Sequence, residues 1–362
     1  MPELPEVEAC CELVSRYCLN STITNVNVIE QGRGPRHGLI DEIVLCESEG
    51  EFEKAMVGKS LLSIERKGKY LWMSVKNAFI LFHCGMTGSF VVKDKEKSTY
   101  KSFKVNDEDV TTGERIFPPR FTKIEIIFAN GNHVAFCDPR RLGRVRILSG
   151  DPRLSPPICD LAPDPIIDGI DLAAFTVGIR KATCPIKSIL LDQQKVICGI
   201  GNWVADEVLY QAGIHPATPC NKLNNAGIQR LATCITHVLS SAIECNSRRE
   251  SFPIHWLFHY RWGKKNQGSP KSPKTKLPNG REISFVTVGG RTSAYVAALQ
   301  PRYGAYNMFE NDLAAAEVHN TEPQGDSTQK KRKQSSGKKE EEGQKRERGQ
   351  QQQKKTNKLT HK

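Results

Sequence analysis

The chain begins with MPELPEVE (residues 1–8), and this stretch decides how the rest of the sequence is interpreted. Removal of Met1 in front of the small Pro2 would leave a secondary amine at the N-terminus, with the carboxyl groups of Glu3 and Glu6 close by in sequence. An α-amino group has a pKa of about 8, well below that of lysine, so a useful fraction is nucleophilic at neutral pH. A proline nitrogen that attacks an aldehyde-like carbon forms a charged iminium, which is an electron sink of the Schiff-base type.

The same stretch also has a purely structural interpretation. Pro5 suits the first position of a helix that runs to about Tyr17, and the carboxylates of Glu6 and Glu8 favour the positive end of that helix. Taken alone, the eight residues favour this second interpretation, so the other motifs of the chain must decide.

Length and composition predict a soluble globular protein. With 362 residues and 38% hydrophobic content, the chain can form two ordinary domains, each with its own core. No run of about 18 apolar residues is present, and the acidic N-terminus lacks the basic start and apolar core of a signal peptide, so neither membrane spanning nor secretion is expected. The 12 cysteines include no Cys-x-x-Cys pair, which predicts reduced, mostly buried thiols and disfavours zinc.

The formal net charge of +12 is distributed unevenly. Residues 330–362 contain 13 Lys or Arg against four acids, a charge of +9, so residues 1–329 carry only +3 from 39 basic and 36 acidic residues. A nucleic-acid interface on the body would therefore need a local patch, while the tail adds a non-specific attraction to phosphate. The run Lys330-Lys331-Arg332-Lys333 suits a nuclear import signal or a phosphate-binding tail, and a merely solvated basic run is the alternative.

Apolar periodicity predicts an α+β fold that opens with a lobe of residues 1–150. One helix is followed by eight short apolar or alternating runs, separated by Gly, Asn and Lys turns, which indicates a two-sheet β-sandwich or flattened barrel. The runs are 22–29, 60–64, 70–75, 78–82, 89–92, 122–128, 133–137 and 144–148.

A proline-rich hinge leads into a second lobe, 151–262, where the period changes to that of helices. Asn221 and Asn224 are candidate caps. The expected helices are 172–181, 185–192, 203–212, 223–245 and, more weakly, 254–262.

The last part of the chain divides in two. A polar gap at 263–276 leads into apolar runs at 282–288 and 292–296, and the glycines between these runs predict a β-hairpin within a unit of residues 263–303. Residues 304–362 are expected to form a disordered basic tail, because a composition of Gln, Lys, Glu, Gly and Ser cannot bury enough surface to fold.

Five further motifs place cations, glycines or apolar residues on turns. RKGKY (66–70) lets one cation reach inward while the others face phosphate. HCGMTG (83–88) and DPRRLG (138–143) are tight turns, and a cation beside an apolar wedge is what insertion into a base stack requires. GIGNW (199–203) offers helix N–H groups to a phosphate with Asn202 as cap, and VGGRT (288–292) places an arginine at a hairpin tip. Each motif alone is equally explained as a salt-bridged turn, a cap or surface charge.

Together and in this order, the motifs resemble those of the formamidopyrimidine-DNA glycosylase and endonuclease VIII family of base-excision repair enzymes, over about residues 2–303. The resemblance implies a bifunctional glycosylase and abasic-site lyase. Pro2 would attack C1′ of the damaged nucleotide, Glu3 would help to open the sugar ring, and β,δ-elimination would follow loss of the base. The partner would be double-stranded DNA with oxidised bases or abasic sites, bound by a monomer that needs no cofactor and no metal.

The resemblance also assigns roles to single positions. Lys69 corresponds to the lysine beside the N-terminal proline, and Asn202 and Arg291 to the groups that clamp phosphates around the flipped nucleotide. The segment around 199–203 resembles the helix–two-turns–helix element. The void left by the everted base would be filled by Met86, Arg140 and Leu142. The implied catalytic residues are Pro2, Glu3, Glu6, Lys69 and Arg291, and the implied DNA-binding residues are Met86, Arg140, Arg141, Leu142, Lys187, Asn202, Glu207 and Arg291.

Departures from the bacterial pattern indicate the branch of the family. Residues 263–300 keep the hairpin and Arg291 but lack the four cysteines of the bacterial zinc finger, so they resemble the zincless finger of plant and fungal members, in which packing replaces the metal. Leu142 stands where bacterial members have an aromatic wedge, and 251–263 is short compared with the loop that covers 8-oxoguanine. We therefore expect ring-opened purines and hydantoin lesions, rather than 8-oxoguanine, as the preferred substrates.

The sequence leaves two other functions open. The first is that of a non-catalytic protein of the same fold that binds damaged DNA or chromatin. The second is that of an RNA-binding module with a disordered tail. Intact Pro2, Glu3 and Lys69 favour the enzyme, because a protein that only binds has no need of all three. RNA binding lacks an aromatic-rich recognition strand. The basic run at 330–333 predicts the nucleus, without excluding an organelle.

Overall fold

The structure, a computed structural model, describes residues 2–31, 34–95, 117–262 and 275–302. All of them belong to one unit of the chain, residues 1–310. The expected tail at 304–362 lies outside the described residues, as does most of the polar gap at 263–276. No helix in the described ranges is both long enough and apolar enough to span a membrane.

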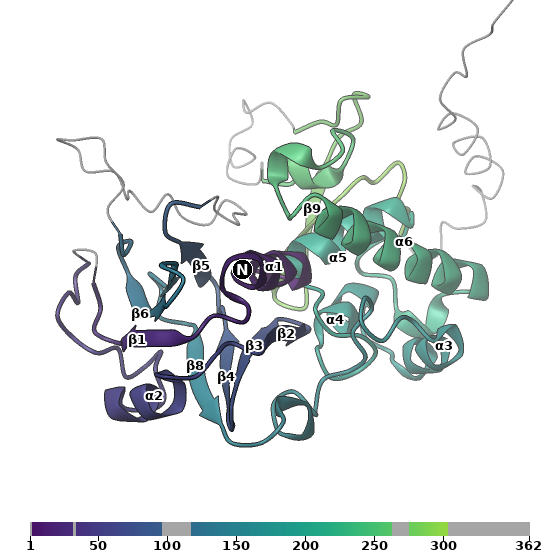
Figure 1. The fold of residues 1–362 in the computed structure, drawn as a ribbon. Helices are drawn as coiled ribbons and strands as arrows, with labels where there is room; N and C mark the ends of the chain where they lie inside the picture. Colours follow the sequence, from purple (N-terminus) through teal and green to yellow (C-terminus); the bar gives the residue numbers. More distant parts are fainter. Residues whose placement is uncertain (1, 32–33, 96–116, 263–274, 303–362) are drawn as a thin grey trace, which may run out of the picture. The chain divides into compact units, whose positions relative to one another are not determined.

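The first lobe combines helix α1 (Leu4–Cys18) with two four-stranded antiparallel sheets (Figure 1). All eight predicted strands are present, the second of them shifted from 60–64 to 63–67. One sheet has the order β1-β6-β7-β5 and is made of β1 (Ile23–Asn27), β6 (Thr122–Phe128), β7 (His133–Cys137) and β5 (Ser89–Val92). The other has the order β2-β3-β4-β8 and is made of β2 (Ser63–Lys67), β3 (Tyr70–Val75), β4 (Ala78–His83) and β8 (Arg144–Leu148).

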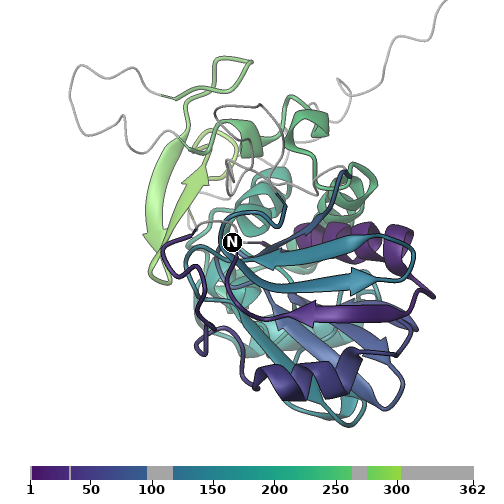
Figure 2. The same cartoon turned by 60° about the vertical axis from the view of Figure 1, so that its left-hand side comes forward.

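An apolar core joins the two sheets and α1, so that the lobe is a β-sandwich (Figure 2). Alternate residues of a strand point to opposite faces, and Ile80 and Phe82 of β4 accordingly belong to this core. The ring of Phe82 lies 5.0 Å from that of Phe90 and 5.5 Å from that of Phe136, which come from the other sheet. The opposite face of β4 is therefore left for other contacts.

A second helix of this lobe, α2 (Glu49–Met56), was not predicted. It begins with a reciprocal capping box between Ser48 and Glu51, and it buries Phe52 and Met56 one turn apart. A serine followed by a glutamate three residues later is a recognised start signal, so the sequence did carry the information.

The second lobe is helical, as expected. Asn224 caps its longest helix by accepting the N–H of Gly227 at 2.8 Å, whereas Asn221 lies inside a short 3₁₀ turn and caps nothing. The prediction of Asn221 as a cap is therefore wrong. The helices are α3 (Leu172–Lys181), α4 (Ile186–Leu191), α5 (Asn202–Gln211) and α6 (Asn225–Glu244).

The helix expected at 254–262 is also wrong, because the structure has only the 3₁₀ turn η4 (Leu257–His259) there. The three consecutive residues Trp256, Leu257 and Phe258 are all buried, which one apolar stripe of a helix cannot achieve. The ring of Phe258 instead packs 5.0 Å from that of Trp203 on α5. Aromatic packing, rather than helical periodicity, determines this segment.

The predicted hairpin is present as β9 (Ser284–Val288) and β10 (Arg291–Tyr295). Gly289 and Gly290 form its turn with φ angles of +56° and +72°, a conformation that favours glycine. An apolar cluster that includes Leu257, Ile283 and Val296 supports the hairpin. Within the described ranges, no group of three or more His, Cys, Asp or Glu side chains is arranged to hold a metal ion.

Candidate active site

The start of α1 reaches across to the second lobe and meets the start of α5. Pro2 is buried, and Leu4 packs into the core of the helical lobe while its N–H donates to the Gly199 carbonyl at 3.1 Å. Gly199 has a φ of +86°, and a Cβ there would lie 2.5 Å from the Leu4 side chain. A residue other than glycine would therefore force the N-terminus away from α5.

The Glu3 carboxylate caps the N-terminus of α5. It accepts the backbone N–H groups of Gly201 at 2.8 Å, Trp203 at 2.9 Å and Val204 at 3.0 Å. An anion is favoured at this position because unpaired N–H groups and the positive end of the helix dipole meet there. The sequence predicted a phosphate on these groups and Asn202 as the cap. Both predictions are wrong: the cap residue is Gly201, and the acceptor is the protein's own carboxylate.

Glu6 lies directly beside Glu3. One carboxyl oxygen accepts the Glu3 N–H at 2.8 Å, and the other accepts the indole N–H of Trp203 at 3.0 Å. Burial, together with the charge of Glu3, raises the pKa of Glu6 to about 8. The Glu6 carboxyl therefore holds a proton at neutral pH. The Glu3 side chain, in contrast, accepts the three N–H groups at the start of α5.

Lys69 approaches the same point from the turn between β2 and β3. Its Nζ donates to the Ile200 carbonyl at 2.7 Å, and burial lowers its pKa, while the charge of Glu3 opposes this shift and that of Arg291 adds to it. Burial thus makes the neutral, proton-accepting form of this lysine easier to reach than that of an exposed one. Arg66 of the same motif is buried as well, against Glu8 and Asp164, so two of its cations point inward where one was expected.

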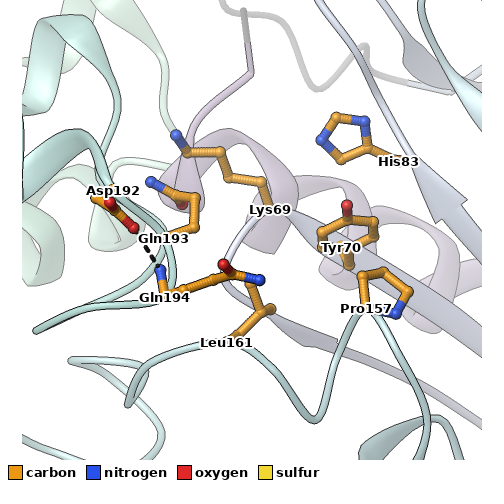
Figure 3. A pocket seen from close by; sticks show the side chains of 8 residues that line it. All are labelled: Lys69, Tyr70, His83, Pro157, Leu161, Asp192, Gln193 and Gln194. Atoms are coloured by element: carbon orange, nitrogen blue, oxygen red, sulfur yellow. Dashed lines mark hydrogen bonds between the residues drawn. The ribbon is translucent and has the colours of Figure 1, made fainter. Parts of the chain in front are cut away.

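Gln193 is a part of the site that the sequence did not reveal. Its Nε2 donates to the Ile200 carbonyl at 3.0 Å, the same atom that binds Lys69, and its Oε1 accepts the Gly199 N–H at 2.9 Å. In Figure 3, Lys69 and Gln193 lie on one side of a pocket of about 260 Å³, with Tyr70 and His83 on the other. The side chain between α4 and α5 thus fixes the carbonyl that orients the lysine.

His83 in this pocket is a neutral imidazole at physiological pH. Burial, together with the charges of Lys69 and Arg144, lowers its pKa to about 4. The rings of His83 and Tyr70 lie 4.6 Å apart. The pocket therefore presents a neutral donor and acceptor beside a cation.

A buried ionic cluster holds the hairpin next to α5. The fully buried Lys187 donates to Asp206 at 2.5 Å and to the Thr292 carbonyl at 3.3 Å, and Asn202 donates to that carbonyl at 3.2 Å. Asp206 also accepts Arg261 at 2.7 Å and the N–H of Ala294 at 3.1 Å. Asp206 and Arg261 were missed, because an acidic pair at 206–207 resembles an ordinary helix surface.

The hairpin places Arg291 at the site. Arg291 is exposed at the first position of β10, and its charge reaches Lys69. The Oδ1 atom of Asn202 is buried and has no donor within the described ranges. Glu207 is different from the other predicted residues: both of its oxygens are engaged by Gln211 and by the N–H of Phe258, and burial raises its pKa to about 7. Glu207 therefore stabilises η4 from the interior and is not part of a DNA-facing surface.

Met86, Arg140 and Leu142 lie on two turns that are tied together. The Asp138 carboxylate accepts the hydroxyl of Thr87 at 2.6 Å on one turn and the N–H of Leu142 at 2.8 Å on the other. Arg140 and Leu142 are exposed, and Met86 is half-buried. The three side chains that would fill a void in a base stack are therefore carried by one rigid unit.

Arg141 is held by the protein itself. Its guanidinium forms two hydrogen bonds to Asp41, at 2.8 and 3.0 Å, and its φ is +57°. Asp41 also contacts Lys123 at 3.0 Å, in the interior of the lobe. The structure thus gives Arg141 a role in fixing the turn beside Leu142.

Two parts of the sequence match known protein-family domains. Residues 1–145 match the model of the formamidopyrimidine-DNA glycosylase N-terminal domain, and residues 161–252 match that of the H2TH domain of the same enzymes. The chain is 35% identical to a formamidopyrimidine-DNA glycosylase of Arabidopsis thaliana over 305 residues, which cover 84% of this chain and 72% of the relative. It is 31% identical to that of Moorella thermoacetica over 248 residues, or 67% of this chain and 78% of the relative.

Solved structures agree with the sequence comparison. The MutM (Fpg) protein of Thermus thermophilus superposes with a TM-score of 0.59 at 25% identity, over 83% of this chain and 99% of that one. The Lactococcus lactis enzyme bound non-covalently to DNA with an abasic site gives a TM-score of 0.61 at 24% identity, over 83% and 99%, and shares the fold. The predicted α+β class is confirmed, and the N-terminal segment, the sandwich and the helix–two-turns–helix lobe together place this chain in the formamidopyrimidine-DNA glycosylase family.

Proposed function

We propose that this chain is a DNA glycosylase of base-excision repair that also cleaves the strand at the resulting abasic site. The observation that carries the proposal is the meeting of the two helix N-termini, which packs Glu3, Glu6 and Lys69 around the residue that follows Met1. Removal of Met1 gives Pro2 a free secondary amine at that point. The relatives named above support DNA as the substrate.

The chemistry proceeds in three steps. The Pro2 nitrogen attacks C1′, the bond from C1′ to the damaged base breaks, and the sugar ring opens as O4′ takes a proton from the Glu3–Glu6 pair. The iminium then draws electrons from C2′, which loses a proton, and the 3′ phosphate leaves by β-elimination. A second elimination releases the 5′ phosphate, and water returns the free amine.

Each neighbouring charge has a part in this scheme. The Glu3 carboxylate, fixed by three N–H groups, stabilises the positive iminium, and Glu6 stores the proton that Glu3 passes on. Lys69, whose pKa is lowered by burial, takes the proton from the attacking amine. Asn202 and Arg291 bind the phosphates around the everted nucleotide, and Met86, Arg140 and Leu142 fill its place in the stack.

Ring-opened purines and hydantoin lesions are the proposed substrates. Leu142 offers no aromatic face to the base that loses its partner, and the described residues 251–262 form only turns and short 3₁₀ segments, with no extended cover. The family resemblance also implies that the protein acts as a monomer. The run at 330–333 would direct the protein to the nucleus, and a fluorescent fusion with these four residues changed to Ala should lose nuclear accumulation.

Trapping with borohydride tests the reaction directly. The protein is incubated with a duplex that contains a formamidopyrimidine, the iminium is reduced to a stable amine, and the adduct is digested and located by mass spectrometry. We expect the deoxyribose fragment on Pro2 of a chain that has lost Met1. Binding without an adduct would instead support a non-catalytic damage-binding protein, and an adduct on Lys69 would contradict the assignment of Pro2.

A further inference from the structure

A trough lies on the outer face of the sheet β2-β3-β4-β8, next to the pocket of the candidate active site. The pairing of β3, β4 and β8 places Tyr70 opposite His83 and His83 opposite Arg144. Leu81 and Arg146 are paired in the same register two residues along. Residues two apart on a strand share a face, so these five side chains point away from the sandwich core.

The chain that follows β8 covers only part of this face. Ile158 is fully buried against Trp72 and Leu81, and Arg153 lies 5.3 Å from the Trp72 ring. The part of the face that Ile158 and Arg153 leave open forms a hollow of about 120 Å³. The residues that line it are Tyr70, Leu81, His83, Arg144, Arg146 and Pro157.

The hollow continues into the pocket of the candidate active site. Tyr70, His83 and Pro157 line both spaces, and Lys69 lines the one nearer to Pro2. Figure 3 shows Tyr70, His83 and Pro157 on the side of that pocket away from Lys69 and Gln193. A polymer that enters the pocket at Lys69 can therefore extend along the sheet toward β8.

The charge of this trough is positive and poorly compensated. Arg144 and Arg146 are exposed on either side of the buried Val145, and neither forms an ion pair with an acid within the described ranges. Arg146 does act on Glu47: its charge lowers the pKa of that carboxyl, although burial raises this pKa overall. Since residues 1–329 carry only +3, a row of cations beginning at Lys69 is a concentration of charge that suits a polyanion.

We propose that Arg144 and Arg146 bind a backbone phosphate of the damaged DNA strand, where that strand extends along the sheet from the pocket at Lys69. The inference rests on the proposed function and extends its DNA contacts beyond the residues that the family resemblance named. A guanidinium presents parallel N–H donors that match two phosphate oxygens, and such contacts fix the register of a strand without reading its sequence. The neutral His83 and the Tyr70 hydroxyl add donors that carry no charge.

The test compares Arg144→Gln and Arg146→Gln with Arg180→Gln, a matched loss of one guanidinium on α3 outside the trough. The dissociation constant for a duplex with a tetrahydrofuran abasic analogue is measured as a function of salt, using the full chain without Met1. Each trough variant should weaken binding about threefold to tenfold at low salt and reduce the salt slope by about one, while Arg180→Gln changes neither by as much. The single-turnover rate at saturating protein should stay at the wild-type value.

Neutral methylphosphonates placed one at a time in the damaged strand then identify the contact. At one position the replacement should weaken binding of the wild type but cause no further loss in the Arg144→Gln/Arg146→Gln protein. Trough variants that behave like Arg180→Gln, or losses that stay additive at every position, would overturn the proposal. A wild type that neither prefers the lesion duplex nor forms an adduct would instead show that the proposed function itself is wrong.

Discussion

Among single residues, Glu6 has the clearest consequence for stability. Its pKa rises from 4.5 to about 8 on folding, so between these values the native state binds a proton that the unfolded state has released. The free energy of unfolding should therefore fall as the pH rises from about 4.5 to about 8, by at most about 1.4 kcal/mol per pH unit from this group. Glu6→Gln cannot titrate, and urea denaturation across this range should show a shallower decline than in the wild type. Parallel wild-type and variant curves would contradict the protonated state of Glu6.

Gly201 is a second position where one atom matters. A Cβ on Gly201 would lie 2.2 Å from the carboxyl carbon of Glu3, so Gly201→Ala must displace the carboxylate that caps α5. We expect a loss of about 2 kcal/mol in stability and at least a hundredfold slower adduct formation. Gly50→Ala is the control, because its Cβ would meet nothing and an added methyl in helix α2 should stabilise by about 0.5 kcal/mol. Equal adduct rates in the two variants would rule out the role of the Glu3 cap.

Among the structural elements, the hairpin depends on a charge that lies outside it. Asp206 joins α4, α5, β10 and Arg261, and Asp206→Asn would leave Lys187 and Arg261 buried with one anion fewer. Removing one member of a buried pair costs about 3–5 kcal/mol, and the amide of Ala294 should exchange with solvent much faster. Asp171→Asn is the matched control, since asparagine caps α3 as well as aspartate does. Unchanged exchange at Ala294 would mean that apolar packing alone holds β10.

The elements also show where sequence patterns suffice. A continuous apolar run predicted β4, alternation predicted β8, and two glycines predicted the turn before Arg291, because each signal is local. The prediction of a helix at 254–262 failed because the conformation of this segment is determined by packing of its buried aromatic side chains against Trp203, which is far away in sequence. Likewise, the glycines before α5 were expected to admit a close neighbour, but only the fold reveals that this neighbour is Glu3 rather than a phosphate.

At the scale of the whole molecule, the two lobes are joined where the chemistry takes place. Leu4 belongs to the core of the helical lobe, whereas Val7, one turn later, belongs to the core of the sandwich. The motifs singled out Glu3, Glu6 and Lys69, which the structure brings together, but they did not predict the ionic contacts that hold these residues. Arg66 is the main example: it spans the lobes to Asp164, and that carboxylate also accepts the N–H of Gly68 at 2.8 Å, next to Lys69.

This joint predicts that the lobes unfold together in the wild type and separately when it is broken. Asp164→Ala leaves the Arg66 guanidinium buried between the lobes with only Glu8, and it also removes the acceptor of the Gly68 N–H. We expect a loss of about 3–5 kcal/mol and a calorimetric trace that divides into two transitions, one for each core. Asp168→Ala is the control, because its carboxylate only accepts the backbone N–H of Asp164 within one lobe. Because Lys69 follows Gly68, Asp164→Ala should also slow adduct formation below the melting range, whereas a single transition with a normal rate would show that Leu4 and Glu3 alone couple the lobes.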